Sequence, residues 1–263
     1  MKHNEIKNYW NERAEEFKTS PEATTNDYYM RQLEIDTLKN KIDIYKENIK
    51  NIADIGCGNG YSTIQLAKQY PSINFSGFDY SDEMIKNAKI NAKKEGVENI
   101  VFDVLDIVSG TIENSYDLIY TDRCLINLQS WNDQKIALEK IFSSLTRNGV
   151  YLMIENFIDG QNNLNKIRQS FGLNDIAIRD HNLFFDLVDV KSFIKKIEGN
   201  FAKYENISSL YYLVSRVIYS KICMIDDKQP DYYDIHHELG SKLPSCGDFG
   251  PIALCIIEKG ENK

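Results

Sequence analysis

The chain has 263 residues, which suits one large domain or one domain with a smaller cap. Its hydrophobic fraction of 42% and charged fraction of 27% are ordinary for a globular protein and exclude a disordered, collagen-like or disulfide-scaffold chain. The net charge of −8 argues against a nucleic-acid partner, because duplex binding normally needs a basic stripe.

The five cysteines are odd in number and form no CxxC pair. This usage favours reduced thiols in a cytoplasmic protein and argues against a zinc cluster. The first ten residues lack the apolar core of a secretory signal. The most apolar stretch, residues 210–225, is interrupted by Arg216 and Lys221, so no membrane span is expected. The frequent Asn, Lys and Ile suggest an AT-rich bacterial genome.

The first predicted element is an amphipathic helix within residues 1–20. Its apolar positions share one helical face. They are Ile6, Tyr9, Trp10, Ala14 and Phe17. A loop at residues 20–27 ends in a helix cap at Asn26 or Asp27, which starts a second helix. Because neither helix belongs to a strand pattern, residues 1–45 are expected to form a helical lid.

Strands and helices alternate through the next hundred residues. The expected strands are 51–55, 73–79, 100–105, 116–121 and 150–155, and the expected helices are 63–70, 81–95 and 133–145. This order predicts an α/β, Rossmann-like parallel sheet with helices on both faces. Residues 46–158 are therefore the predicted cofactor-binding core.

The alternation breaks down after residue 156. Residues 157–200 are expected to mix helix and loop, and residues 201–225 fit either a strand or a helix. Residues 226–250 are expected to form a loop, followed by a last, antiparallel strand at 251–259. We therefore expect residues 159–263 to hold an acceptor-side insertion after strand five and the final strands of the same domain.

The sharpest motif is DIGCGNG at residues 54–60, at the first strand-to-helix junction. Its glycines allow a tight turn and a close approach of a ligand to the main chain. Parallel sheets bind ligands at the carboxyl ends of their strands. Asp79 ends the next strand, 19 residues beyond Gly60, where an acid accepts both ribose hydroxyls.

The spacing of this motif separates two classes of cofactor. A dinucleotide loop reads GxGxxG, but the third glycine position here is Tyr61. Asp54 also places an anionic group close to where a pyrophosphate would lie. A ligand with a ribose, an adenine and a cationic amino-acid tail fits better, and S-adenosylmethionine has these parts.

The chain resembles the class I S-adenosylmethionine-dependent methyltransferases over residues 50–156, through ADIGCGNG, FDYS, VFDVLDI, YDLIYTDRCLINL and LTRNGVYLMIEN. The resemblance implies that the glycine loop lies against the methionine moiety, that Asp79 holds the ribose, and that Asp106 and Ile107 read the adenine. It also implies that the Thr121 carbonyl meets the methionine amino group. The implied cofactor-binding residues of this core are Asp54, Gly56, Cys57, Gly58, Asp79, Tyr80, Met84, Asp106, Ile107 and Thr121.

The flanks resemble a subset of bacterial small-molecule or surface-glycan methyltransferases. YWNERAEEF is similar to a lid helix whose aromatic, here Tyr9, covers the cofactor. TTNDYYMRQLE resembles a segment whose Arg, here Arg31, reaches the cofactor carboxylate. TDRCLINLQSW, HNLFF and SKLPSCGDFGP complete the likeness. Many relatives carry His where Ile126 and Asn127 stand, so no base or metal ligand is implied there.

Candidate residues for the acceptor lie outside the glycine loop. His181 in RDHNLFF and His237 in the loop before the last strand are the candidate catalytic bases. The candidate acceptor-binding residues are Arg123, Glu155, Asn156, Tyr211 and Tyr212. The adjacent His236 and His237 lack the i, i+4 spacing of a two-histidine metal site, so no metal is expected.

These observations predict an S-adenosylmethionine-dependent methyltransferase that acts on a small molecule or a glycan or sugar-nucleotide precursor, on oxygen, and releases S-adenosylhomocysteine. A methyltransferase of RNA or protein is an alternative, which the acidic composition disfavours. An NAD(P)-dependent oxidoreductase and a nucleoside-binding module without catalysis are two further alternatives. The sequence carries no signal for an oligomeric state.

Overall fold

The computed structural model describes residues 3–260, and their side chains from Glu5 onward. Seven strands form one sheet in the order β3-β2-β1-β4-β5-β7-β6. They are β1 (Asn51–Ile55), β2 (Asn74–Asp79), β3 (Ile100–Val104), β4 (Tyr116–Asp122), β5 (Leu145–Asn156), β6 (Gly199–Asn206) and β7 (Ile252–Lys259). The five strands β3, β2, β1, β4 and β5 pair in parallel in that order, and β7 runs antiparallel to β5 and β6. The predicted Rossmann-like α/β fold with an antiparallel last strand is confirmed.

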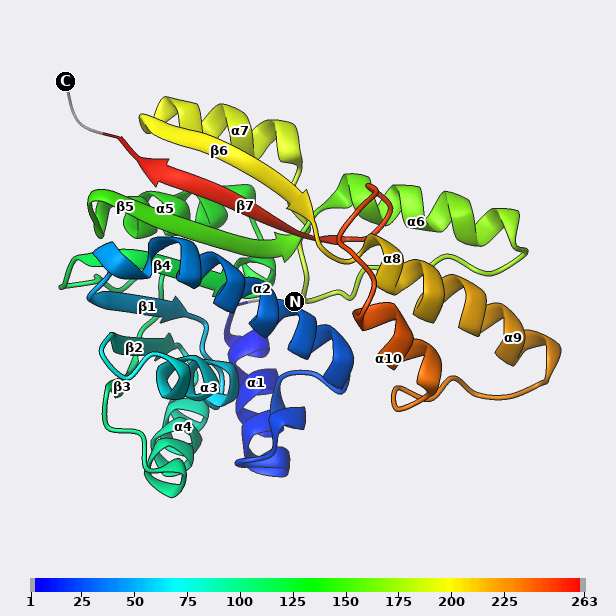
Figure 1. Ribbon diagram of the computed structural model, residues 1–263, viewed down its shortest axis with the longest axis horizontal. Coiled ribbons are helices and arrows are strands. Elements are labelled where there is room, and N and C mark those ends of the chain that lie inside the picture. Colours follow the sequence, from blue (N-terminus) through cyan, green and yellow to red (C-terminus); the bar gives the residue numbers. More distant parts are fainter. Residues whose placement is uncertain (1–2, 261–263) are drawn as a thin grey trace.

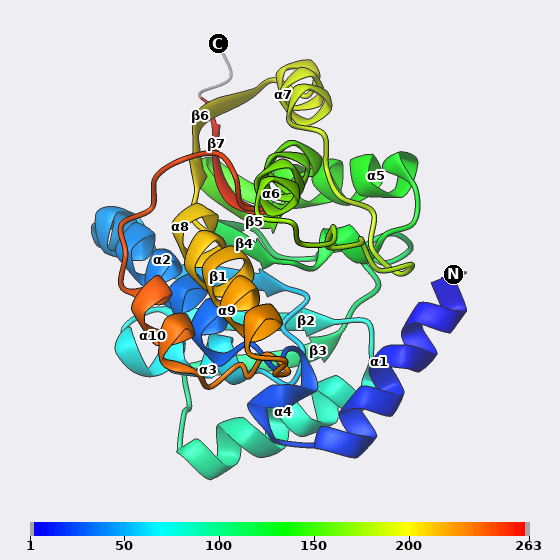
Figure 2. The ribbon, with the colours of Figure 1, turned by 90° about the vertical axis from the view of Figure 1, so that its right-hand side faces the viewer.

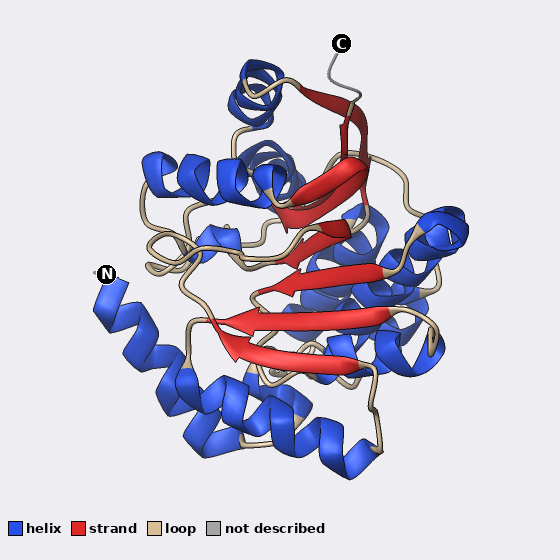
Figure 3. Cartoon of the chain, turned by 90° about the vertical axis from the view of Figure 1, so that its left-hand side faces the viewer, coloured by secondary structure: helices blue, strands red, loops and turns tan. Residues whose placement is uncertain are grey.

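Helices cover both faces of this sheet (Figures 2 and 3). The described α-helices before residue 200 are α1 (His3–Phe17), α2 (Tyr28–Tyr45), α3 (Tyr61–Gln69), α4 (Asp82–Glu95), α5 (Trp131–Ser143), α6 (Ile158–Ser170) and α7 (Leu187–Lys196). Helices α2 and α3 contribute to one apolar core, and α5 and α7 contribute to the core on the opposite face. Short 3-10 turns occupy Pro21–Ala23, Lys46–Asn48 and Leu125–Asn127.

The central strands are apolar on both faces, as parallel strands between two helical layers must be. In β4, Leu118 and Tyr120 pack toward α2, whereas Ile119 packs toward α5. In β5, Leu152 packs toward α2, whereas Tyr151 packs toward α5. Because successive strand residues face opposite sides, one continuous apolar run fills both cores.

Side-chain caps start the helices near the carboxyl edge of the sheet. The Asp27 carboxylate accepts from the Met30 amide at 3.1 Å and starts α2, as predicted. The Ser81 hydroxyl accepts from the Met84 amide at 3.1 Å and starts α4. Each cap satisfies an amide that has no partner within its helix, which fixes where the helix begins.

The C-terminal third departs most from expectation. Residues 201–225 hold both a strand and a helix: most of β6, then α8 (Ser209–Tyr212), a π-helix (Leu213–Ile218) and α9 (Tyr219–Ile225). The segment 226–250, predicted as a loop, contains α10 (Ile235–Ser241). Asp234 caps α10 by accepting from the His236 amide at 3.0 Å. Seven residues are too few for a periodic signal, and packing on α2 and α8 stabilises this helix instead.

Helices α6, α9 and α10 lie beyond the carboxyl ends of the parallel strands (Figure 1). Helix α1 packs on α4, outside the sheet. None of the described helices is both long and apolar enough to cross a bilayer. The elements added to the sheet therefore gather around the edge at which parallel sheets bind ligands.

Candidate cofactor and acceptor site

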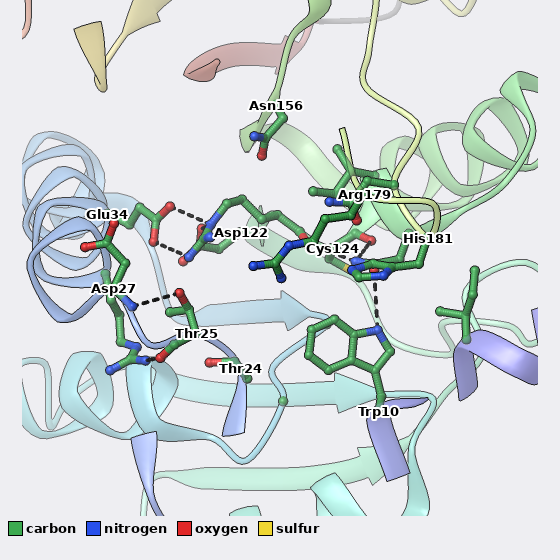
Figure 4. A pocket seen from close by; sticks show the side chains of 18 of the residues that line it. Trp10, Thr24, Thr25, Asp27, Glu34, Asp122, Cys124, Asn156, Arg179 and His181 are labelled. Carbon is green, nitrogen blue, oxygen red and sulfur yellow. Dashed lines mark hydrogen bonds and ion pairs between the residues drawn. The ribbon is translucent and has the colours of Figure 1, made fainter. Parts of the chain in front are cut away.

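A cavity of about 390 Å³ opens at the carboxyl edge of the sheet. Its wall combines the glycine loop and the ends of β1, β2, β4 and β5 with α1, residues 24–31, residues 176–184 and the π-helix. Figure 4 shows side chains from these elements converging on the cavity. Segments far apart in the sequence therefore build one site.

The glycine loop needs its glycines. Gly56, Gly58 and Gly60 have φ angles of +86°, +54° and +76°. The amides of Gly56 and Cys57 donate to the Phe78 carbonyl at 2.7 and 2.9 Å, which ties the loop to β2. A Cβ at Gly58 would lie 2.5 Å from Cγ2 of Thr24. The loop thus turns tightly and leaves its main chain on the cavity wall, where Gly56, Cys57 and Gly58 all lie.

Asp79 joins the glycine loop to the start of α4. One carboxylate oxygen accepts from the Gly58 amide and the other from the Ser81 amide, both at 2.9 Å. Burial raises the pKa of Asp79 to about 6, although these amides favour the charged form. Each oxygen keeps a second acceptor position, so the carboxylate can still receive two hydroxyl donors.

Asp54 lies at the floor of the cavity on β1. Its carboxylate accepts from the Thr63 hydroxyl at 2.6 Å and from the Tyr120 hydroxyl at 2.9 Å. Only 3% of the residue is exposed, and burial raises its pKa to about 7. Two hydroxyl donors thus hold this acid in place at the start of the glycine loop.

The predicted adenine side is also on the wall. Tyr80, Met84, Asp106 and Ile107 line the cavity there. Asp106 accepts from the Val108 amide at 2.9 Å, which fixes the turn after β3. Met84 packs with Ala14 and Ala23, so this side is partly built by the N-terminal segment.

Arg31 is buried on the wall, with 4% of its surface exposed. Its guanidinium donates to the carbonyls of Pro21, at 2.7 Å, and Thr25. Its Nε is buried and has no hydrogen-bond partner among the described residues. A buried donor without a partner is costly, and an anionic group in the cavity would satisfy it.

The acceptor half of the cavity includes Arg123, Asn156 and His181, as predicted candidates. Arg123 pairs with Glu34 of α2 through two contacts of 2.7 and 2.9 Å. The His181 ring stacks on Tyr9 with the centroids 4.9 Å apart, which joins the 176–184 loop to α1. Tyr212 also lines the cavity.

Two predicted acceptor residues, Glu155 and Tyr211, do not line the cavity. Glu155 is fully buried, and its carboxylate accepts from the amides of Cys124, Leu125 and Ile126 at 3.2, 2.9 and 3.3 Å. It therefore shapes the turn after β4. The Tyr211 hydroxyl is turned inward and donates to Asp27.

His237, the second predicted catalytic base, lies away from the cavity wall. It is fully buried on α10, not on a loop, and does not line the cavity. Its Nδ1 lies 2.8 Å from the Tyr211 hydroxyl, and its Nε2 lies 3.3 Å from the Arg216 guanidinium. These contacts place it in the packing between α8, α10 and the π-helix.

Thr121 is also off the cavity wall, and its hydroxyl lies 2.8 Å from that of Tyr151. Its neighbours Tyr120 and Asp122 are the β4 residues that line the cavity beside the glycine loop. The role implied for the Thr121 carbonyl stays a prediction.

Several polar residues on the wall were not predicted as site residues. They are Arg13, Asp27, Cys124 and Arg179. Arg179 opens the RDHNLFF segment that contains His181, so its motif was part of the prediction. Arg216 also lines the wall, because the π-helix brings it to the site, where it pairs with Asp27 at 2.6 Å.

A family model described as a methyltransferase domain matches residues 46–217, more than half of the chain. This chain belongs to that methyltransferase family. Its class I fold and the cofactor predicted from the glycine loop, S-adenosylmethionine, are those of the family. The match extends beyond the α/β core into the π-helix, so the family resemblance includes part of the acceptor side.

Curated relatives of this methyltransferase share about three residues in ten with it over the segments that align. A malonyl-[acyl-carrier protein] O-methyltransferase of Bacillus anthracis is 31% identical over 120 residues, which are 46% of this chain and 41% of the relative. A carboxy-S-adenosyl-L-methionine synthase of Nautilia profundicola is 32% identical over 137 residues, 51% of this chain and 55% of the relative. The chain thus spans about half the length of the curated relatives it matches.

Solved methyltransferase structures share the fold over nearly the whole chain. Magnesium protoporphyrin IX methyltransferase from Synechocystis, with bound S-adenosylhomocysteine, aligns with a TM-score of 0.63 and 13% identity over 98% of this chain and 100% of that one. A methyltransferase from Clostridium acetobutylicum aligns with a TM-score of 0.60 and 15% identity over 96% and 99% of the two chains. At these identities the likeness shows the fold alone.

The cavity of this methyltransferase fits its cofactor. The partnerless Nε of Arg31 matches an amino-acid carboxylate, and the open acceptor positions of Asp79 match ribose hydroxyls. A Cβ at Gly56 or Gly58 would meet Cys124 or Thr24, which also line the cavity, so the loop needs glycine at both positions. The residues present therefore suit the amino-acid carboxylate and the ribose of S-adenosylmethionine.

Glu155 predicts a measurable pH effect on stability. Burial raises the pKa of its carboxyl to about 8, well above the ordinary value of the unfolded chain. The folded protein therefore holds this proton at a pH at which the unfolded chain has lost it, and stability falls as pH rises toward 8. Between pH 5.5 and 8 this carboxyl should lower the free energy of unfolding of the wild type by about 3 kcal/mol. We expect that loss to be absent from Glu155→Gln when both proteins are measured by chemical unfolding.

The control for this prediction is Glu139→Gln, which changes an exposed acid of α5. Its pH dependence should match that of the wild type. Equal pH slopes for the wild type and Glu155→Gln would mean that the Glu155 carboxyl is ionised in the folded protein, with the three amides outweighing burial.

Proposed function

We propose that this protein transfers the methyl group of S-adenosylmethionine to an oxygen atom of a small-molecule acceptor, with glycan or sugar-nucleotide precursors among the candidates. The observation that carries the proposal is that one cavity joins the glycine loop and Asp79 to Arg123, Asn156 and His181. A cofactor half and a polar acceptor half share the same space. The name of the Bacillus anthracis relative, an O-methyltransferase, supports oxygen as the accepting atom.

When bound, S-adenosylmethionine supplies a methyl group already activated by its sulfonium centre. The chain's own residues then have to orient the acceptor, exclude water and take up a proton if the acceptor is a hydroxyl. Tyr9, Trp10 and His181 cover the cavity from the α1 side, and the Trp10 Nε1 donates to the Asn127 side chain at 3.3 Å. These contacts hold the cover closed over the reacting groups.

His181 is the candidate base of this reaction. Burial and the neighbouring Arg179 lower the pKa of the imidazole, so the ring is neutral at neutral pH. A neutral imidazole can accept the proton of an acceptor hydroxyl, which typically accelerates such reactions about 10²–10⁴-fold.

RNA and protein acceptors are the alternative class. The chain carries a net charge of −8, which repels a nucleic-acid backbone. Carboxylates of Asp27, Glu34, Asp106 and Asp122 also line the cavity. These charges favour a small acceptor that enters the cavity over a polynucleotide that lies across its mouth.

Label transfer tests the proposal. The purified protein is incubated with methyl-labelled S-adenosylmethionine and a bacterial extract, and label is then counted in the small-molecule, RNA and protein fractions. We expect label in the small-molecule fraction, much reduced with Asp79→Ala, and base-labile or ether-type products on mass analysis. Label confined to RNA or protein would overturn the proposed acceptor class.

The lid predicts a cofactor-dependent change in hydrogen exchange. Helix α1 lies outside the sheet and is held there mainly by side-chain contacts. Ala14 packs against Met84, the Asn87 side chain donates to the Ala14 carbonyl at 3.0 Å, the Ser81 hydroxyl donates to the Asn11 side chain at 2.6 Å, and Tyr9 stacks on His181. Ordering this helix costs about 1–2 kcal/mol per residue, so bound ligand should steady it. We expect amides 5–17 to exchange several-fold more slowly with S-adenosylhomocysteine, while those of α5 stay unchanged. Equal exchange of amides 5–17 in both states would make α1 a fixed structural helix.

A further inference from the structure

Arginines are concentrated at this cavity. Arg13, Arg31, Arg123, Arg179 and Arg216 line it, and no lysine among the described residues does. The only other arginines of the chain are Arg147 and Arg168. Because a guanidinium presents a planar fork of donors, this choice suits recognition of oxyanions better than a general positive charge.

Four of these five arginines already have partners in the protein. Arg123 and Arg216 pair with the carboxylates of Glu34 and Asp27. Arg13 and Arg31 donate to backbone carbonyls of the segment 21–25. These four therefore hold α1, α2 and the π-helix in their places around the cavity.

Arg179 differs from the other four. The residue is exposed and lines the cavity, and its side chain forms no ion pair or hydrogen bond within the described residues. Acidic side chains such as Asp27, Asp106 and Asp122 line the same cavity, yet none of them lies within ion-pairing distance of it. In a cavity with many carboxylates, an unpaired guanidinium is the group that can attract and bind an anion.

The loop that carries Arg179 is anchored on both sides. The Gln161 side chain donates to the Ile176 carbonyl at 2.9 Å, before Arg179. After it, the Gln129 side chain donates to the His181 carbonyl at 2.8 Å, and the Gln134 side chain donates to the Leu183 carbonyl at 2.9 Å. Three glutamine side chains thus present Arg179 on a positioned backbone, which lowers the entropy cost of binding.

Asn156 gives an independent sign of a ligand at this wall. It is 7% exposed, lines the cavity, and its Oδ1 has no hydrogen-bond partner among the described residues. Figure 4 shows Asn156, Arg179 and His181 on one side of the cavity, across from Asp27 and Glu34. A buried acceptor without a donor is costly unless a bound molecule supplies one.

We infer that Arg179 binds an anionic group of the methyl acceptor, a carboxylate or a phosphate. The inference rests on the proposed function and adds to it the charge of the acceptor. Arg179 is then a specificity-determining residue: it selects oxyanion-bearing small molecules and leaves the cofactor half untouched. A sugar-nucleotide and an organic acid both satisfy this chemistry.

Calorimetry with small anions tests the inference. The protein is first saturated with S-adenosylhomocysteine and then titrated separately with malonate and with inorganic phosphate. The variants are Arg179→Gln, Arg179→Lys and the matched control Arg147→Gln, which removes an exposed arginine outside the cavity. We expect Arg179→Gln to weaken binding of at least one anion about tenfold, Arg179→Lys to weaken it less, and Arg147→Gln to leave it within twofold.

The two probes separate carboxylate from phosphate recognition, since the anion that loses affinity in Arg179→Gln identifies the group. Wild-type protein that binds neither anion, or Arg179→Gln that binds both as the wild type does, would overturn the inference. The initial saturation with S-adenosylhomocysteine separates a failure of this inference from a failure of the proposed function. If S-adenosylhomocysteine saturates every variant equally and only the anion result fails, the methyltransferase proposal stands without Arg179.

Discussion

Gly58→Val is expected to abolish S-adenosylhomocysteine binding at concentrations that saturate the wild type. Gly58 has a φ angle of +54°, a conformation that a β-branched residue rarely adopts. Its new Cβ would lie 2.5 Å from Cγ2 of Thr24, and the Gly58 amide would move away from Asp79. The change thus displaces both the main chain that faces the ligand and the carboxylate predicted to hold the ribose. Isothermal calorimetry on folded protein measures the loss.

Gly96→Val is the matched control. Gly96 also has a positive φ, +66°, but a Cβ there meets nothing within 4 Å, and the residue does not line the cavity. This variant should lose stability, by about 1–3 kcal/mol from backbone strain, and keep its affinity for S-adenosylhomocysteine. A folded Gly58→Val protein that binds like the wild type would refute the assignment of the glycine loop.

Asp79→Ala is expected to weaken S-adenosylhomocysteine binding by one to two decades. A carboxylate that accepts two ribose hydroxyls contributes about 1.5–3 kcal/mol, and its removal also leaves the Gly58 amide without a partner. Asp79→Asn should retain part of the affinity, because the amide oxygen still accepts one bond. Calorimetric titration of both variants gives the two dissociation constants.

Asp103→Ala provides the comparison for Asp79. Asp103 is an exposed acid on the neighbouring strand β3 that pairs with Lys89 at 3.7 Å and is not among the residues that line the cavity. Its removal should leave the affinity within twofold, since exposed pairs contribute little. Equal affinities for Asp79→Ala and Asp103→Ala would remove Asp79 from the cofactor site.

The cofactor half of the site was predictable because its signals are local. Glycines at a strand-to-helix junction and an acid at the end of the next strand need only the order of elements to be placed together. Gly58 and Asp79 do meet, through a 2.9 Å hydrogen bond. Five parallel strands with short connections leave few ways to arrange these residues.

The acceptor half was harder to predict because it depends on packing between distant segments. His237 and Tyr211 were sensible candidates by residue type, yet both face inward toward Asp27 and Arg216. Arg216 reaches the cavity through a π-helix, which has no sequence signature. Glu155 ends a strand at the right edge, but three amides after β4 needed an acceptor and its carboxylate turned to them.

The most direct test of the account is a calorimetric titration of the wild-type protein with S-adenosylhomocysteine and, separately, with NAD. The glycine loop, Asp79 and Arg31 predict saturable binding of one S-adenosylhomocysteine per chain and no measurable binding of NAD. Asp79→Ala should weaken the first titration and leave the second unchanged. Binding of NAD in place of S-adenosylhomocysteine, or of neither, would contradict the assignment of this cavity as a methyl-donor site.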